Sequence, residues 1–382
     1  MHRIRLSTSR RPAPRGWAWL ARTMLATVVL ASLPATAAHA QLQIYGTNAN
    51  GIYRINSATG AGVQVYTGTP FSGGYAAGAA QRPSDGVLFF VVGSGGNDAL
   101  YRWDPATPAT APVFVGNTGV PYMPRLGFST SGSLYGVDMG TNSIYLLNQS
   151  TGAGTATGAG LTGGPAGNTG GDLAFHPADG YMYIPTGTGN PYTLYRVPVT
   201  GGALTSVGTF TGMPCDPSGA AFDAAGTLYV QCSTSNNLYT VPITGGAATL
   251  VGTGPAALQD LASVPAPPPT VTMSLSPGTL GAPGATSVLT ITLTNPASVQ
   301  QRGAAFTLGY PANMVNAPTP AGATTCGGTV AAAAGGGSAS LSGGTIPAGG
   351  SCTVTVTVTT TTAGTYVVDL PAGGLLTIIG AN

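Results

Sequence analysis

The sequence predicts an all-β protein, a five-bladed β-propeller followed by an immunoglobulin-like β-sandwich. The first observation is a block that recurs five times, each time opening on an apolar–aromatic pair: Ile44-Tyr45, Leu88-Phe89, Leu134-Tyr135, Met182-Tyr183 and Leu228-Tyr229. Its aromatic residues are 44, 46, 48 and 46 positions apart. A period of this size, filled with short strand-like segments, is typical of propellers, in which one repeat forms one blade. The second observation is a Pro-rich run, after which the composition changes to long Thr/Val alternation.

Residues 1–40 are predicted to be a signal peptide. Six Arg residues precede a short apolar run, Leu25 to Leu33, and Ala38-His39-Ala40 is a cleavage motif before Gln41. The apolar run is too short for a membrane-spanning helix, which needs about 20 residues. We therefore expect cleavage, no membrane insertion afterwards, and an extracytoplasmic protein that is secreted or associated with the cell surface.

Residues 41–264 are predicted to form the propeller. In the fourth block, four short strands are expected at 172–175, 181–184, 194–197 and 204–207, with Gly, Pro, Asn or Asp between them. The fifth block repeats this pattern at 219–222, 228–231, 238–241 and 248–251, and third strands recur at 52–55, 100–103 and 144–147. The first block lacks an innermost strand, whereas Asp260–Val264 resembles the innermost strand of the fourth. Pairing of these two ends would close the ring and remove its open edges.

Residues 265–269, Pro-Ala-Pro-Pro-Pro, are expected to be a short, stiff, extended linker. Residues 270–382 then alternate apolar and polar side chains, most clearly in Thr353–Val358, which places three Val on one face and three Thr on the other. Further strands are expected at 271–275, 288–293, 306–308 and 366–370. About seven short strands in this length are typical of an immunoglobulin-like sandwich.

The four cysteines form two local pairs, one in each predicted domain. Four cysteines allow three connectivities, and pairing across two separate domains is the least favourable geometrically. We therefore predict the disulfides Cys215–Cys232 and Cys326–Cys352 in an exported protein. A four-cysteine zinc site would need the close C-x-x-C spacing that this sequence lacks.

Residues 285–382 resemble the Ig-like repeat domains of uncharacterised function found in bacterial secreted and surface proteins. The resemblance is carried by Leu289–Pro296, Thr325–Thr329, Leu341–Cys352 and Ala363–Tyr366 before Leu370–Gly373. Family members usually have Thr-Asp-Thr-Leu-Pro where this chain has Thr307–Pro311. The repeat region resembles, more loosely, bacterial propellers of the NHL and YVTN type, which implies a fold and little about activity.

Charge excludes some partners. All basic residues are Arg and all acidic ones are Asp, and removal of the signal peptide leaves six Arg against ten Asp, a net charge of −4. A chain of this kind has no basic patch to neutralise phosphates, so we expect no nucleic acid as a partner.

Most catalytic chemistry is also poorly represented. Propeller enzymes such as gluconolactonase-like lactonases and streptogramin lyases rely on Glu, His and Asp at the central channel. This chain has no Glu, and His176 is the single His after cleavage. His176 is expected to be a turn residue between two strands. No G-x-S-x-G, H-E-x-x-H or P-loop motif occurs.

A candidate ligand site nevertheless emerges from the alignment of the repeats. Arg125, Asp172 and Asp260 share the first position of the innermost strand, where Gly219 and Ala77 stand in the other two blades. This position is expected at the channel mouth, close to loops carrying Tyr75, Tyr122 and Met213. The three charges would either hold a polar ligand or cation, or form an internal ion-pair network that plugs the channel. A calcium site would use these Asp, although no dense Asp/Asn loop is present.

Two functions follow as hypotheses. The first is a non-enzymatic exported protein, acting in binding or adhesion or as a structural component of the cell surface, with a surface polysaccharide or protein as ligand and no cofactor. The alternative is a propeller hydrolase or lactonase that uses the channel Asp residues, with or without a metal. The absence of Glu and the single His favour the first.

Overall fold

The computed structural model describes residues 26–27, 41–71, 75–93, 97–163 and 171–382, and every regular element within these ranges is a β-strand. Most of the predicted signal peptide lies outside the described residues. Its one described part, β1 (Ala26–Thr27), pairs with β25 (Thr279–Leu280). The described ranges contain no helix of the length and apolarity needed to span a membrane.

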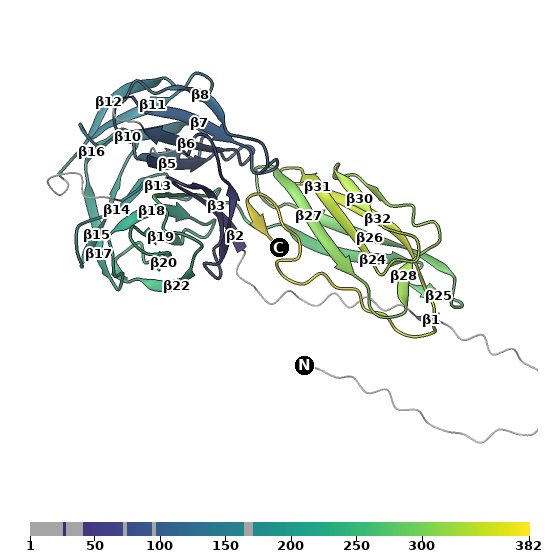
Figure 1. The fold of residues 1–382 in the computed structure, drawn as a ribbon. Coiled ribbons are helices and arrows are strands. Elements are labelled where there is room, and N and C mark those ends of the chain that lie inside the picture. The colour runs from purple at the N-terminus through teal and green to yellow at the C-terminus, as the bar shows by residue number, and fades with distance from the viewer. Residues whose placement is uncertain (1–25, 28–40, 72–74, 94–96, 164–170) are drawn as a thin grey trace, which may run out of the picture.

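Residues 41–262 form five separate sheets, which together make the larger lobe in Figure 1, the propeller-like domain. Sheet 1 contains β23 (Asp260–Ala262), β2 (Gln41–Asn48), β3 (Gly51–Asn56) and β4 (Gly62–Tyr66). Sheet 2 contains β5 (Tyr75–Gln81), β6 (Leu88–Gly93), β7 (Ala99–Trp103) and β8 (Val113–Asn117). Sheet 3 contains β9 (Arg125–Phe128), β10 (Leu134–Asp138), β11 (Ser143–Leu147) and β12 (Gly154–Thr162).

The remaining two sheets correspond to the fourth and fifth blocks. Sheet 4 contains β13 (Ala174–Phe175), β14 (Met182–Thr186), β15 (Tyr192–Val197) and β17 (Thr205–Thr211). Sheet 5 contains β18 (Pro217–Phe222), β19 (Leu228–Cys232), β20 (Asn237–Val241) and β22 (Thr249–Thr253). Each predicted third strand lies within β3, β7 or β11, because the apolar–aromatic pattern recurs at the same distance from each hairpin.

The five innermost strands surround a common axis. Strand β5 contacts β9, β9 contacts β13, β13 contacts β18, β18 contacts β23, and β23 returns to β5. Strand β23 comes from the end of this region and pairs antiparallel with β2, in the register Tyr45↔Ala262 and Thr47↔Asp260. The two ends of the propeller-like domain are therefore joined within one sheet.

The outer edges of neighbouring sheets are also linked. Strand β16 (Gly202–Ala203) pairs in parallel with β12 of sheet 3, and β21 (Gly246–Ala247) pairs in parallel with β17 of sheet 4. Each of these two-residue strands follows a turn that contains glycine. It pairs with the adjacent sheet, and the chain then continues into the outermost strand of its own sheet. The outermost strand expected at 204–207 consequently begins only at Thr205, and part of its hairpin covers the neighbouring edge.

Residues 270–382 form the smaller lobe, the C-terminal domain, in which two sheets enclose one apolar core. One sheet contains β24 (Thr270–Ser276), β26 (Thr286–Thr294), β32 (Ser351–Thr360), β28 (Met314–Asn316) and β29 (Ala323–Thr324). The other contains β27 (Gln301–Gly309), β31 (Ser338–Ile346) and β30 (Thr329–Ala331). In β32 the three Val side chains are buried, as their alternation predicts: Val354, Val356 and Val358.

The prediction of a strand at Tyr366–Leu370 is wrong. This segment has no ladder pairing, although Tyr366, Val368 and Leu370 are buried alternately in the core. Alternation of buried and exposed side chains indicates only that one face of the segment is buried. An extended segment can bury one face without pairing with a neighbouring strand.

Both predicted disulfides are confirmed. Cys215–Cys232 joins the start of sheet 5 to the end of β19, and Cys326–Cys352 lies in the core of the C-terminal domain. Each closes a local loop within one domain.

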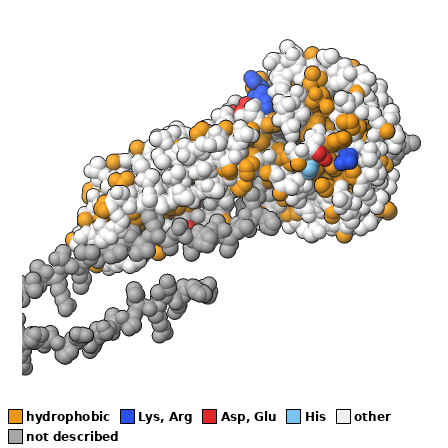
Figure 2. Space-filling view, turned by 180° about the vertical axis from the view of Figure 1, so that it is seen from behind, with side chains coloured by type: hydrophobic (Ala, Val, Ile, Leu, Met, Phe, Trp, Pro, Cys, Tyr) orange, Lys and Arg blue, Asp and Glu red, His pale blue; other side chains and the backbone are white. Residues whose placement is uncertain are grey.

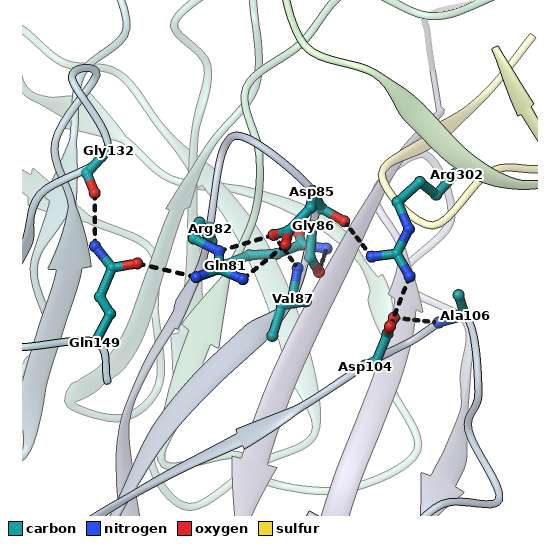
Figure 3. A network of polar contacts seen from close by, with 10 residues as sticks. All are labelled: Gln81, Arg82, Asp85, Gly86, Val87, Asp104, Ala106, Gly132, Gln149 and Arg302. Carbon is teal, nitrogen blue, oxygen red and sulfur yellow. Dashed lines mark hydrogen bonds and ion pairs between the residues drawn. The ribbon is translucent and has the colours of Figure 1, made fainter. Parts of the chain in front are cut away.

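The two domains are in direct contact. Strand β33 (Gly380–Ala381) pairs with β2 at Gln41 and Leu42, so the last residues of the chain extend sheet 1. Arg302 of the C-terminal domain donates hydrogen bonds to the Asp85 carbonyl oxygen (3.0 Å) and the Asp104 carboxylate (2.6 Å) (Figure 3). Val264, Val299, Ile378 and Ile379 form a small apolar cluster beside these contacts.

Candidate functional site

The register of the sheets defines where the three predicted charged residues lie. Arg125 lies opposite Val137, and Asp260 lies opposite Thr47. Asp172 lies two residues before the start of β13. These positions are equivalent, at the start of the innermost segments of sheets 3, 1 and 4.

A small residue occupies the same position in the other two sheets. Gly219 is the expected residue in sheet 5. In sheet 2 the expected residue, Ala77, lies opposite Val91, and a β-bulge between Ala77 and Ala79 adds Gly78 directly after it.

The two carboxyl groups are buried and bonded to the backbone. Asp260 and Asp172 are 0% and 1% exposed. Asp172 accepts hydrogen bonds from the Leu173 N–H (2.6 Å) and the Ala220 N–H (2.8 Å). Asp260 accepts from Leu261 N–H (2.6 Å) and from the Ala79 N–H of sheet 2. Each carboxyl group therefore joins its own strand to the innermost strand of another sheet.

The glycines make this joining sterically feasible. A Cβ atom at Gly219 would lie 2.6 Å from Leu261 Cγ and 2.8 Å from the Leu261 backbone nitrogen. One at Gly78, where φ is +77°, would lie 2.8 Å from the Met123 carbonyl oxygen. Glycine tolerates both the close approach and the left-handed conformation. The innermost strands can thus approach closely enough for a short Asp side chain to reach the next backbone.

Asp172 and Asp260 are hydrogen-bonded to each other, and burial makes both hard to ionise. Burial raises the pKa of Asp172 to about 7, opposed by hydrogen bonds from Asp260 and from backbone N–H groups. Burial also raises the pKa of Asp260 well above its usual value, and the neighbouring Asp172 charge and its hydrogen bond raise it further. Since two adjacent buried carboxylates repel, ionisation of one carboxyl group disfavours ionisation of the other.

Arg125 supplies the positive charge next to this pair. Its side chain is 5% exposed, and Nε donates a hydrogen bond to the Gly171 carbonyl oxygen (3.1 Å). Burial lowers the pKa of Arg125 to about 10, and the neighbouring Asp172, Tyr122 and Asp260 side chains oppose this effect. Arg125 stays charged at neutral pH and balances the pair.

Of the loop residues expected nearby, Tyr122 is 43% exposed and Met213 is buried. The side chain of Tyr75 lies outside what the structure describes. His176 is a turn residue: its Nδ1 accepts a hydrogen bond from the Asp179 N–H (3.3 Å), and its ring packs edge-on against Phe222. Within the described ranges, no cluster of three or more His, Cys, Asp or Glu could hold a metal ion.

A second candidate site lies at the opposite ends of the innermost strands. A cavity of about 260 Å³ is lined by residues from all five of these strands, by the linker, and by Ala297–Val299 of the C-terminal domain. Phe128, Phe175 and Phe222 contribute to this lining from equivalent positions of three sheets. Seen from behind, hydrophobic side chains extend from the junction of the lobes across the larger lobe (Figure 2).

Sequence reasoning missed this cavity. A signal was present, because Leu126-Gly-Phe128, Leu173-Ala-Phe175 and Ala220-Ala-Phe222 repeat an aromatic residue at one position. The linker and Ala297–Val299 complete the cavity next to these Phe residues, and this contact joins segments that are far apart in the chain.

The described residues thus define an all-β protein with a propeller-like domain and a two-sheet C-terminal domain. Two family models match separate parts of it: a repeat of unknown function (DUF6923) matches residues 171–265, and a domain of unknown function (DUF7933) matches residues 269–382. No curated protein matches the chain.

Several solved structures are similar at 14–15% identity. A protein of unknown function from Bacteroides caccae is 14% identical, with a TM-score of 0.35, and the match covers 53% of this chain and 69% of that one. Virginiamycin B lyase from Staphylococcus aureus is 15% identical (TM-score 0.33; 60% and 69% covered). A calcium-binding protein, regucalcin, from Agrobacterium tumefaciens is 15% identical (TM-score 0.36; 54% and 66% covered). The matches thus span about two thirds of these three proteins.

Proposed function

We propose that this chain is an exported, non-enzymatic protein of the bacterial cell surface, a five-bladed β-propeller with an Ig-like module that binds a surface polysaccharide or protein. The observation that supports it best is the state of Arg125, Asp172 and Asp260. All three are buried, and both carboxyl groups accept hydrogen bonds from backbone N–H groups. Groups held in this way stabilise the ring, whereas general acid–base catalysis requires contact with a substrate proton.

Two further features support export and surface binding. Both disulfides are formed, and such bonds persist in oxidising compartments. The mature chain is acidic and has few charges, and Thr, Ser, Asn and Gly supply polar surface suited to neutral ligands. Tyr122, exposed beside the buried charges, is the residue through which the propeller mouth would contact such a ligand.

The test is the binding of purified exported protein to cells and to isolated envelope polysaccharide of the source bacterium. We expect saturable binding that Tyr122→Ala weakens. Phe114→Ala, which removes another exposed aromatic side chain on an outer strand, should leave binding unchanged. Equal weakening by both variants would move binding away from the mouth. If the folded wild-type protein binds neither cells nor polysaccharide, the proposal fails.

One observation favours the alternative, a hydrolase or lactonase. The pKa of Asp172 is raised to about 7, the range in which a carboxyl group serves as an acid or base at neutral pH. On this alternative, the purified protein hydrolyses simple lactones, and Asp172→Asn abolishes turnover while the protein remains folded. Turnover that survives Asp172→Asn, or no turnover by the wild type, contradicts it.

A further inference from the structure

The cavity at the second end of the channel has a defined chemical character. Its lining contains Phe128, Phe175 and Phe222 together with Leu, Val, Pro and Ala side chains, and no charged residue. Because no lining residue is charged, an ionised group bound here would lose part of its hydration without gaining a counter-ion. A ligand that fits this site is therefore uncharged.

Its size restricts the ligand further. An apolar cavity of about 150 Å³ in another protein holds a benzene molecule. At about 260 Å³ the present cavity is larger and accommodates a molecule of about two fused rings. Flat aromatic molecules pack well on aromatic side chains through offset or edge-to-face contacts.

Polar groups are present among the lining residues as well. Thr130 and Ser298 are exposed lining residues, from the propeller-like domain and the C-terminal domain respectively. Each hydroxyl both donates and accepts a hydrogen bond. A hydroxyl or carbonyl substituent on the ligand therefore has suitable partners.

The walls are held in place by contacts between the domains. Gln301 of the C-terminal domain donates a hydrogen bond to the Pro267 carbonyl oxygen (3.0 Å), which keeps the linker against the cavity. Arg302, the next residue, is bonded to Asp104 and to the Asp85 carbonyl oxygen, as Figure 3 shows. A site formed before the ligand arrives does not have to be ordered by it, which favours binding.

We propose that this interdomain cavity binds an uncharged, flat aromatic molecule of about two rings carrying a hydroxyl or carbonyl group. The inference rests on the binding function proposed above and adds to it a small-molecule site, separate from the mouth at Tyr122. Both domains contribute to this site, so the C-terminal domain completes it.

The experiment is titration of the purified exported protein with 2-naphthol, followed by calorimetry. We expect saturable binding with one site per chain. Ser298→Trp places a large ring among the lining residues and should weaken binding by at least about tenfold. Ser342→Trp changes another exposed serine of the same domain, outside the lining, and should leave binding unchanged. 2-Naphthoate, which carries a carboxylate, should bind at least about tenfold more weakly than 2-naphthol.

Absence of saturable naphthol binding by the folded wild type overturns the inference, as does binding that Ser298→Trp leaves intact. Equal affinity for naphthoate overturns the assignment to uncharged ligands. Adhesion to cells is measured separately. Cell binding without naphthol binding refutes this site alone, and naphthol binding without cell binding refutes the surface function alone.

Discussion

At the scale of single residues, one position of the repeat decides how neighbouring sheets are joined around the channel. Where that position is Asp172 or Asp260, the carboxyl group reaches a backbone N–H of another sheet. The N–H belongs to Ala220 or Ala79, each of which directly follows a glycine, Gly219 or Gly78. An Asp on one sheet and a Gly on another thus complement each other around the channel.

The buried carboxyl pair predicts an unusual pH dependence of stability. Both Asp172 and Asp260 have a pKa raised above that of the unfolded chain, so the folded state retains protons that the unfolded state has already lost. The stabilisation is complete below about pH 4 and is lost as the pH rises through the folded-state value, about 7 for Asp172. We expect the thermal midpoint of the exported protein to fall between pH 5 and pH 8, measured by circular dichroism.

A substitution of Arg125, the buried cation next to the two carboxyl groups, provides the control. Arg125→Met removes the charge that balances the ionised pair, so it should destabilise the protein more at pH 8 than at pH 5. Asp85 acts in the opposite direction at lower pH: burial opposes its ionisation, but the hydrogen bonds from Arg82 and the Val87 N–H, together with the charges of Arg82 and Arg302, outweigh this and lower its pKa. Its contribution is lost only below about pH 4. A midpoint that rises from pH 5 to pH 8 would contradict the pairing of the two carboxyl groups.

At the scale of elements, the short strand β23 closes the ring of five sheets. It has three residues, yet it completes sheet 1 and contacts the innermost strands β5 and β18. Leu261 at its centre is buried in the apolar cluster that joins sheet 1 to sheet 5.

Leu261→Ala should therefore destabilise the protein strongly. Removal of a fully buried Leu side chain costs about 2–5 kcal/mol, because the cavity that remains is only partly refilled. Leu250→Ala is the matched control, since Leu250 lies on β22 of sheet 5 and is 53% exposed. It should change the free energy of unfolding by less than about 0.5 kcal/mol. Urea denaturation measures both, and similar values for the two variants would mean that β23 is not needed to hold the ring together.

Element boundaries were predictable where one repeat suffices to define them. The third strands follow from Ile52-Tyr-Arg-Ile55 and its counterparts, because each is bounded by its own turns. The exchange of β16 and β21 between sheets was not predictable, since a two-residue strand pairs wherever an open edge lies within reach. The segment at 366–370 shows the converse, alternation without a pairing partner.

At the scale of the whole molecule, the junction of the two domains both forms the cavity and holds the last residues of the chain on sheet 1. Arg302 is its principal ionic contact, with Asp104 as the acidic partner. Because both side chains are partly exposed, the pair contributes about 1 kcal/mol or less. Its position nevertheless couples the two lobes.

Arg302→Ala should weaken this coupling. We expect the calorimetric unfolding of the two domains to separate, with a lower midpoint for the first transition. Arg102→Ala removes an exposed Arg on β7 and should leave the trace unchanged. Identical traces for the two variants would show that the apolar cluster at Val264 and the pairing of β33 with β2 hold the junction without Arg302.

The sequence by itself determined the repeat, the all-β class, the position of the innermost strands and both disulfides. These are local properties, set by side-chain alternation, turn residues and the distance along the chain between cysteines. Only the tertiary structure decided that Asp172 and Asp260 are buried side by side, that a β-bulge adds Gly78 after Ala77, and that the C-terminal domain covers a cavity behind Phe128, Phe175 and Phe222. The reason is physical: burial, the pKa of a carboxyl group and the shape of a cavity depend on atoms brought together from distant parts of the chain.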